Sequence, residues 1–379
     1  GVWPPVTGVP QPGQTYAEWM QFWAKLDTFT YRDALEPYLT GTNFNATQQA
    51  QMCKDAGMEM VYVMPRHHDG YAIWDTQTST ILAPNGFKIG NSPYNPSNRD
   101  YLKEQVDAFR AAGLRVGFYF SLGDWHHPDF PHSGGPWAHP QPGVSNPPGH
   151  TENWSNYVSY LHQQVREIVD PNTGTDYGKF DVVYFDYSTA AINGEDWGAT
   201  KLVHMVRQYQ PDIIINNRLW NGLDNPNGDF ATPEAVVPGQ GYDRDWEAIL
   251  SANIPPTWGY GGSNYAFKTP RQLVWDIVDV CSKGGLVELS VSPKGDGSIH
   301  PDQVAAYAGL GSWMAVNGES IKGTTASPVG TRPAWGAMTS KRAENRLYMH
   351  VVNRPSDGNV VGAGLFGQVS GAWLLGDPA

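Results

Sequence analysis

The sequence predicts an α/β protein whose main part is a closed (β/α)8-like TIM barrel, followed by a small C-terminal β domain. Two observations carry this prediction: predicted helices alternate with short, almost uninterrupted apolar runs, and the alternation stops near residue 316. Such apolar runs are typical of parallel strands with both faces buried. A repeated helix–strand order predicts a parallel sheet covered by helices, and the number of repeats favours closure into a barrel.

The repeated units follow one another from about residue 45 onward. The predicted helices cover, in chain order, residues 46–56, 101–112, 154–169, 197–210 and 270–283. The strand-like runs that follow them are residues 58–65, 114–120, 180–186, 212–216 and 286–291. Residues 1–15 are rich in Pro and Gly and are expected to be a lead-in. The long loop at residues 124–150 is expected to be functional or mobile.

The regular pattern ends with a predicted helix at residues 301–316. Beyond it, strand-like segments at residues 347–352 and 372–375 are separated by Gly, Pro and Asp turns. We therefore expect a catalytic barrel over residues 1–320 and a β-sandwich-like domain over residues 321–379, which is either compact or cut short.

Composition and charge exclude some classes of partner. The 379 residues include 25 basic and 37 acidic ones, which gives a formal net charge of −12. This balance argues against nucleic acid, whose binding depends on Lys and Arg neutralising phosphates. No apolar run is long enough to span a bilayer. Several of the 15 Trp and 19 Tyr residues stand beside Gly, Pro and Asp, where ring faces suit sugars; packing of core and loops is the alternative.

Three features concern the cell compartment. Cys53 and Cys281 fall in predicted helices, so two separate buried thiols are expected, with pairing left open. The chain starts at Gly1 instead of Met, which suggests a processed product. Residues 45–47 and 153–155 match the N-glycosylation acceptor pattern. A secreted or periplasmic location is therefore expected.

Two carboxylates follow the predicted strands at the end where barrel enzymes carry out their chemistry. Asp186 comes directly after the apolar residues 182–185, and Glu234 lies in a later loop. Cleavage of a glycosidic bond needs two carboxyl groups, one as nucleophile or base and one as proton donor. The alternatives are that Asp186 caps the next helix and that Glu234 is a first-turn helix acid.

Other groups at the strand ends suit the hydroxyls of a sugar, namely His67, His68 and Arg218. A metal site is not expected, because adjacent residues of an extended chain point to opposite sides, so His67 and His68 cannot readily chelate one ion. The loop histidines lack the spacing of metal ligands. No metal or organic cofactor is predicted.

At these positions the sequence resembles the α-L-fucosidase family of glycoside hydrolases (family 29), from about Pro10 to the C-terminus. The matching segments are residues 66–71 with Trp74, then residues 117–121, 217–218, 229–234, 257–260, 282–285 and 293–297. The resemblance implies a barrel followed by a β-sandwich. It also implies release of a terminal α-L-fucosyl residue by a two-step displacement that retains configuration.

The resemblance further implies roles for single residues. Asp186 falls on the family's nucleophile, and Glu234 falls on the acid/base of part of the family. The substrate-binding residues that it implies are Trp23, His67, His68, Trp74, Tyr119, Arg218 and Trp258. Tyr119 would lie near the nucleophile and the indoles would wall the pocket. The expected partner is an oligosaccharide or polysaccharide, and the sequence does not predict the oligomeric state.

Two departures from the family pattern affect the expected sugar. The fucose-binding histidine of the family's first barrel strand aligns with Trp23, which cannot accept a hydrogen bond. Glu288 replaces an apolar residue of the last strand and would need a buried partner, for which Arg66 is the candidate. Loss of a hydrogen-bonding partner changes specificity strongly. Fucose bound differently, a related L-galacto-configured sugar and a substituted fucose therefore all stay open.

Two alternatives to an exo-acting fucosidase remain. An endo-acting hydrolase of a sulfated or otherwise substituted fucan would have an open cleft in place of a pocket. A catalytically silent carbohydrate-binding protein would have a collapsed or blocked pocket.

Overall fold

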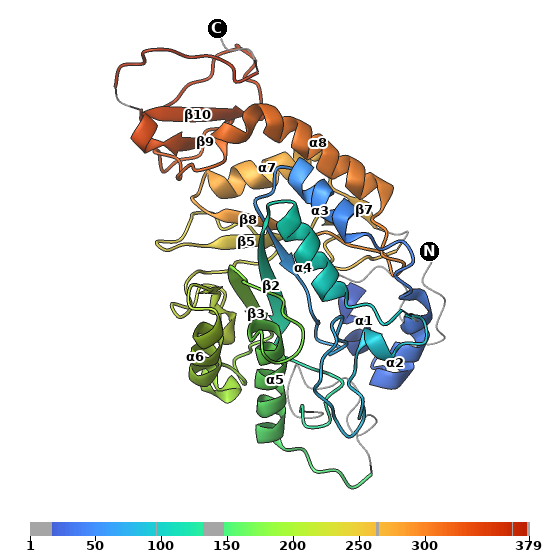
Figure 1. Cartoon of the computed structure of the whole chain (residues 1–379). Helices are drawn as coiled ribbons and strands as arrows, with labels where there is room; N and C mark the ends of the chain where they lie inside the picture. The colour runs from blue at the N-terminus through green and yellow to red at the C-terminus, as the bar shows by residue number, and fades with distance from the viewer. Residues whose placement is uncertain (1–16, 96, 132–147, 263–264, 366, 377–379) are drawn as a thin grey trace.

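The computed structural model of the chain describes residues 17–95, 97–131, 148–262, 265–365 and 367–376. Its main sheet has four parallel strands in the order β1–β2–β3–β4 (Figure 1). These are β1 (Met60–Val63), β2 (Arg115–Ser121), β3 (Val182–Asp186) and β4 (Ile214–Ile215). Ser121 pairs with Asp186, so the C-terminal ends of β2 and β3 lie level. The predicted parallel α/β sheet is confirmed.

Beyond β4 the sheet continues through single parallel bridges. Asn216 bridges Phe230, Ala231 bridges Trp246 and Glu234 bridges Ile249. β5 (Glu247–Leu250) then pairs in parallel with β8 (Leu286–Leu289), and the short β6 (Asn253–Ile254) pairs with β7 (Ala266–Phe267). Within the described part of the chain no ladder joins β8 to β1. Closure of the barrel stays a prediction.

Each predicted helix is present close to its predicted range. The long helices are α3 (Ala46–Asp55), α4 (Tyr101–Ala111), α5 (Trp154–Val169), α6 (Ala199–Tyr209), α7 (Pro270–Cys281) and α8 (Pro301–Asn317). Helices α4, α3, α8 and α7 pack in that order along the outside (Figure 1). The short 3-10 turns are η1 (Ala17–Trp19), η2 (Glu36–Tyr38), η3 (Ile89–Asn91), η4 (Gly194–Trp197), η5 (Asn217–Leu219), η6 (Gly318–Ser320) and η7 (Arg342–Glu344).

The two predicted glycosylation sites have a structural role. The side chain of Asn45 caps α3 by accepting a hydrogen bond from the amide of Gln48, and Asn153 caps α5 by accepting one from the amide of Ser155. Asn is among the best N-cap residues. Helix capping therefore explains both Asn residues without any glycan.

The segment aligned with the family's first barrel strand is helical. It forms α1 (Met20–Trp23) and α2 (Thr28–Leu35). The Asp27 carboxylate accepts hydrogen bonds from the amides of Phe29 and Thr30, both at 3.1 Å. This N-cap starts a helix where the alignment would place a strand end.

The two faces of the main sheet bury different side chains. Val63, Phe118, Phe120, Val183 and Phe185 belong to the large core shared with the helices. Tyr119, Val182, Tyr184 and Phe230 form a separate cluster with Met60 and Tyr62. Because side chains alternate along a strand, Asp186 lies on the same face as Val182 and Tyr184. We call this the inner face.

The C-terminal part contains a two-stranded antiparallel hairpin of β9 (Gly336–Lys341) and β10 (Arg346–Val351), which lies beyond the end of α8 (Figure 1). β10 matches the predicted strand at residues 347–352. Residues 372–375, also predicted as a strand, form none of the described strands, and Leu374 is 73% exposed. The β-sandwich stays a prediction.

Cys53 and Cys281 are both free, as expected, and lie in α3 and α7. Burial raises the pKa of the Cys53 thiol to about 11 and that of Cys281 to about 12. None of the described helices is long and apolar enough to cross a membrane. Residues 132–147 of the predicted long loop lie outside the described residues.

Candidate active site

Hydrogen bonds to the backbone at the end of β3 fix the position of Asp186, independently of the contacts of its side chain. Asn216 exchanges two hydrogen bonds with the backbone of Phe185, both at 2.9 Å. The amide of Leu122 donates to the carbonyl oxygen of Asp186 at 2.8 Å. Tyr187 has a φ of 100°, which is rare for a residue other than Gly and turns the chain out of the strand. Asp186 therefore projects from a rigid strand end.

Three side chains surround the Asp186 carboxylate. The Tyr119 hydroxyl donates to Oδ2 at 2.7 Å, and Arg218 Nη1 donates to Oδ1 at 3.0 Å. His68 Nε2 lies 4.0 Å from Oδ2. Burial, together with the charge of Asp186, raises the pKa of Tyr119 well above its usual value, so this hydroxyl remains a donor. The carboxylate keeps 21% of its side-chain surface exposed and can be reached by a substrate.

Arg218 joins Asp186 to Glu234. Its Nη1 also donates to Glu234 Oε2 at 2.6 Å. The rest of the guanidinium is held by Thr232, whose hydroxyl accepts from Nε and whose carbonyl accepts from Nη2, both at 2.9 Å. Because one nitrogen touches both carboxylates, their nearest oxygens are closer than the roughly 6.5–9.5 Å typical of inverting glycosidases.

The two predicted histidines lie beside this pair. Their ring centroids are 3.7 Å apart, so the expectation that they point to opposite sides is wrong. The His68 Nδ1 atom lies 2.8 Å from the hydroxyl of Ser121, which itself donates to a backbone carbonyl. Nδ1 therefore carries the proton, and Nε2 can accept a hydrogen bond.

Burial keeps both histidines uncharged at neutral pH. It lowers the pKa of His67 to about 4, against the opposing charge of Asp186. It lowers the pKa of His68 well below its usual value, and the positive charge of Arg218 adds to this. A neutral imidazole can both donate and accept, which suits sugar hydroxyls. The described residues contain no group of three or more His, Cys, Asp or Glu side chains that could hold a metal.

The predicted pair of Arg66 and Glu288 is wrong. Arg66 forms a buried ion pair with Asp124 and donates to the carbonyl of Ser121 at 2.9 Å. Its guanidinium lies 4.7 Å from the ring of Phe120, a residue of the helix-side core. Glu288 instead interacts with groups of the inner face, so the two side chains lie on opposite faces of the sheet.

Glu288 has a carboxyl group as its neighbour. Its side chain is hydrogen-bonded to Glu247 of β5, and Glu247 Oε1 accepts the Tyr62 hydroxyl at 3.0 Å. Burial raises the pKa of Glu247 to about 7, and burial together with the charge of Glu247 raises that of Glu288 well above its usual value. One Glu288 oxygen is buried and has no hydrogen-bond partner among the described residues.

The sequence profile of the α-L-fucosidase family matches residues 6–319. This chain belongs to the α-L-fucosidase family. It is therefore a glycoside hydrolase. Plasma α-L-fucosidase of Homo sapiens is 26% identical over 346 residues, which cover 88% of this chain and 67% of that protein. α-L-Fucosidase of Dictyostelium discoideum is 24% identical with the same coverage.

Solved structures of α-L-fucosidases share the fold. Isoenzyme 1 from Paenibacillus thiaminolyticus has a TM-score of 0.79 and 34% identity, over 90% of this chain and 79% of that one. An α-L-fucosidase from Bacteroides thetaiotaomicron has a TM-score of 0.75 and 25% identity, over 92% and 78%. The latter structure is a trapped covalent intermediate in complex with 2-fluoro-fucosyl fluoride.

In this member of the α-L-fucosidase family, the three predicted indoles differ in their surroundings, and one of them, Trp74, has no surface available to a sugar. Trp74 is 1% exposed and donates to Glu167 of α5 at 3.2 Å, so it is a packing residue with no face open to a sugar. Trp23 is 44% exposed and packs on neighbouring aromatic residues of its own segment. The backbone amide of Trp258 donates to Glu18 at 3.2 Å.

The aromatic residue that reaches the site from the N-terminal helices is Trp19. Its ring centroid is 5.1 Å from that of His68, edge to face, and 6.3 Å from that of Tyr187. Sequence reasoning missed Trp19 because the alignment placed the family's histidine on Trp23. The four-residue spacing of the two indoles is the signal that could have identified it, since residues four apart share one helix face.

Proposed function

We propose that this chain is a retaining, exo-acting α-L-fucosidase that releases terminal α-L-fucose, or a closely related residue, from an oligosaccharide or polysaccharide. The observation that carries the proposal is the contact of Arg218 Nη1 with both Asp186 and Glu234. Such a short separation suits two-step displacement, for which the carboxyl groups stand roughly 5–5.5 Å apart. The identity of the sugar, fucose, is inferred from membership in the family.

In the proposed reaction, Asp186 attacks the anomeric carbon and forms a glycosyl-enzyme. Glu234 first donates a proton to the departing glycosidic oxygen and then takes one from the incoming water. Arg218 and Tyr119 hold the Asp186 carboxylate in place through their hydrogen bonds at 3.0 and 2.7 Å. The neutral His67 and His68 bind sugar hydroxyls, with Trp19, Trp23 and Trp258 as candidate walls of the fucose site.

The proposed architecture is the closed barrel and C-terminal β-sandwich implied by the family, divided near residue 320. The packing of α8 against α3 supports closure, because it continues the helical layer past the edges of β8 and β1, which no ladder joins within the described ranges. Gly311 permits this approach, since a side chain there would collide with the carbonyl oxygen of Asp55. A secreted or periplasmic location remains part of the proposal.

The test is hydrolysis of p-nitrophenyl α-L-fucoside followed by proton NMR during the first minutes. The proposal predicts that α-L-fucose appears first and that its β-anomer forms later by mutarotation. First appearance of the β-anomer would contradict a retaining mechanism. Cleavage of a substituted fucan without release of single fucose would favour the endo-acting alternative. Absence of hydrolysis with retained fucose binding would favour the silent binding protein.

A further inference from the structure

The proposed reaction leaves one pair of carboxyl groups on the inner face unused, namely Glu247 and Glu288. Glu247 is 5% exposed, and its Oε1 accepts the Tyr62 hydroxyl at 3.0 Å. Glu288 is partly buried, and one of its oxygens has no hydrogen-bond partner among the described residues. Because burial of carboxyl groups costs free energy, packing alone does not account for the pair.

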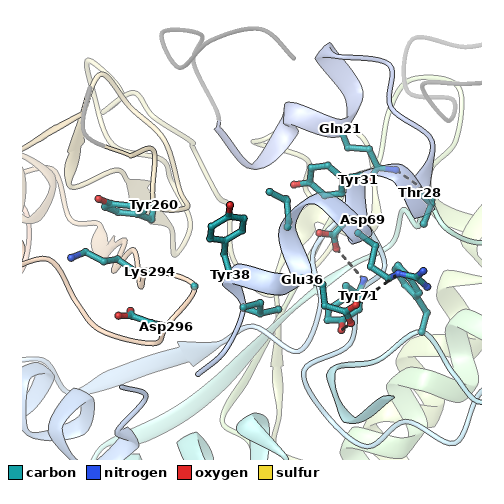
Figure 2. A pocket seen from close by; sticks show the side chains of 15 residues that line it. Gln21, Thr28, Tyr31, Glu36, Tyr38, Asp69, Tyr71, Tyr260, Lys294 and Asp296 are labelled. Atoms are coloured by element: carbon teal, nitrogen blue, oxygen red, sulfur yellow. Dashed lines mark hydrogen bonds and ion pairs between the residues drawn. The ribbon is translucent and has the colours of Figure 1, made fainter. Parts of the chain in front are cut away.

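The pair lies apart from the cavity beside α2. Figure 2 shows this cavity, of about 400 Å³, between Tyr31 and Asp69 on one side and Tyr260 on the other. Neither Glu247 nor Glu288 is among the described residues that line it. The groups that act on the pair are therefore those of the inner face.

The register of the strands places Glu288 level with Glu234. Glu288 pairs with Ile249 on one side of β5, and Glu234 bridges the same residue on the other side. The amide of Ile249 donates to the carbonyl of Pro233 at 3.1 Å, and the carbonyl of Ile249 accepts the amide of Ala235 at 3.0 Å. Paired residues of neighbouring strands point to the same face, so the two glutamates stand two strand spacings, or about 10 Å, apart.

Aromatic rings lie between the pair and the catalytic groups. The ring of Tyr184 is buried, and the guanidinium carbon of Arg218 lies 5.4 Å from its centroid. The Tyr184 centroid is 6.0 Å from that of Tyr119, the donor to the nucleophile, and 5.9 Å from that of Tyr62, the donor to the pair. Charges on the two sides of such a layer are screened much less than charges at the surface.

The charged and titratable groups that face the pair come from four stretches of the chain. They are Tyr62 of β1, Tyr184 of β3, Arg218 of η5 and Glu234 of the stretch bridged to β5. On the opposite face of β8, Val287 and Leu289 pack on the core formed with α7 and α8. The charge of Arg218 favours the ionised form of Glu288, whereas the charge of Glu234 opposes it. This repulsion is mutual, so a charge on the pair also opposes ionisation of Glu234.

The pair loses its first proton near neutral pH. Burial raises the pKa of Glu247 to about 7, although hydrogen bonds from Tyr62 and Glu288 oppose the rise. Burial, followed by the charge of Glu247, raises the pKa of Glu288 well above its usual value. The first negative charge therefore forms on Glu247, while Glu288 keeps its proton.

The acid/base carboxyl needs such a charge. Arg218 Nη1 donates to Glu234 at 2.6 Å, and this contact by itself favours the ionised form, which has no proton to give. We propose that Glu247 and Glu288 are positioning residues for the reaction: the negative charge that the pair acquires as the pH rises keeps Glu234 in the protonated form that donates to the leaving group. The inference rests on the proposed fucosidase function for the role of Glu234. The pair acts by repulsion and does not touch the sugar.

The test is the pH profile of kcat/KM in a Glu247→Gln/Glu288→Gln variant, whose amides keep the shape of the pair and do not ionise. Methyl α-L-fucoside is the substrate, because its alcohol needs a proton to leave. We expect the ratio of variant to wild-type kcat/KM to fall roughly 3- to 10-fold between about pH 5.5 and 8, as for a basic limb moved down by roughly 0.5 to 1 pH unit. The fall should be smaller for p-nitrophenyl α-L-fucoside, whose leaving group needs little protonation.

Tyr62→Phe tests the same charge with a smaller change to the protein. It removes a donor to Glu247 and so delays ionisation of the pair to higher pH. The basic limb should again move to lower pH, by less than in the double variant. If the double variant does not fold, an unmoved limb in folded Tyr62→Phe overturns the inference. Tyr307→Phe is the matched control and should leave the profile unmoved, because the Tyr307 hydroxyl donates to the carbonyl of Ser290 on the helix side of the sheet.

Three results for the double variant would overturn the inference. A merely structural role would lower kcat/KM by the same factor at every pH. A basic limb moved to higher pH would show that the charge of the pair does not protect the proton of Glu234. A shift of equal size for both substrates would show that the pair acts on a group other than the proton donor.

Infrared difference spectroscopy tests the coupling without turnover. The spectrum of a protein minus that of its Glu234→Gln variant isolates the carboxylate band of Glu234. We expect this band to appear at lower pH in the Glu247→Gln/Glu288→Gln background than in wild type, and the same midpoint in both would overturn the inference. If wild type hydrolyses neither fucoside, the proposed function fails; in that case, or if only the aryl fucoside is cleaved, this measurement decides the coupling separately.

Discussion

Arg218 contacts both carboxylates of the candidate site through one nitrogen, while Thr232 holds the other two nitrogens. A lysine has one compact ammonium in place of this planar fork and cannot keep all these contacts. We therefore expect Arg218→Lys to lower kcat/KM for p-nitrophenyl α-L-fucoside about 100-fold or more, as for loss of other preorganised charge contacts. If the folded variant keeps kcat/KM within twofold of wild type, Arg218 has no role in positioning the two carboxylates for catalysis.

Tyr119 offers a finer test of the same site. Its hydroxyl donates to Asp186 at 2.7 Å, and Tyr119→Phe removes that hydrogen bond while keeping the ring. Hydrogen bonds to charged groups contribute about 1.5–3 kcal/mol, so kcat is expected to fall roughly 10- to 100-fold. Tyr348→Phe serves as control, because Tyr348 lies in the β9–β10 hairpin and its hydroxyl donates to Glu319. Equal rates for the two variants would contradict a role for Tyr119.

Sequence reasoning identified the polar part of the site better than its aromatic part. Tyr119 and Asp186 lie near the C-terminal ends of β2 and β3, Arg218 follows β4, and Glu234 lies in a later stretch bridged to β5, so their side chains meet at one edge of the sheet. The partner of Trp74 could not be predicted, since Glu167 lies 93 residues further along the chain. Residue order specifies which strand end carries a side chain, but not the side on which that side chain packs.

At the scale of elements, β5 and β8 bring Glu247 and Glu288 together on the inner face. Below neutral pH the folded chain holds these carboxyls in their protonated form, because burial raises the pKa of Glu247 to about 7 and that of Glu288 well above its usual value. Groups with a raised pKa stabilise the fold below their unfolded pKa, near 4.5. That stability is lost as the pH rises through the folded value.

We therefore expect the carboxyl pair to contribute a fall in the free energy of unfolding, on the order of 3 kcal/mol, as the pH rises from 5 to 8. The lowered pKa values of the buried His67 and His68 contribute a rise over the same range, so the contribution of the pair is measured as the difference between wild type and a variant that lacks it. Glu288→Gln should remove much of this dependence, since an amide does not ionise. Urea unfolding at a series of pH values measures it, with Glu344→Gln as the control because Glu344 is half exposed in η7. An unchanged pH dependence in Glu288→Gln would show that the carboxyl pair does not titrate with folding.

The helices at residues 20–35 show a limit of reasoning from alignment. The family pattern predicted a barrel strand there, yet Asp27 followed by Thr28 is also a local signal for the start of a helix. In the structure, Asp27 caps α2. The local capping signal predicts this helix better than the alignment does. The two hydrogen bonds to the Asp27 side chain form within the segment and need no neighbouring strand.

At the scale of the whole molecule, the order of helices and parallel strands followed from periodicity, because strands buried on both faces read as apolar runs. The pairing of strands at the edges of the sheet could not be predicted from periodicity. The stretch around Phe230 and Glu234 joins the sheet through single bridges that no apolar run announces. Nor does periodicity reveal whether β8 meets β1, because an unpaired edge and a paired edge have the same pattern of side chains.

The central claim is that Asp186 forms a covalent bond to the sugar. Incubation with 2-deoxy-2-fluoro-α-L-fucosyl fluoride, followed by intact-protein and peptide mass spectrometry, tests it most directly. We expect a mass increase of one fluorofucosyl group, located on the peptide that carries Asp186, and no increase in Asp186→Asn. A label on another residue, or labelling that persists in Asp186→Asn, would contradict the account.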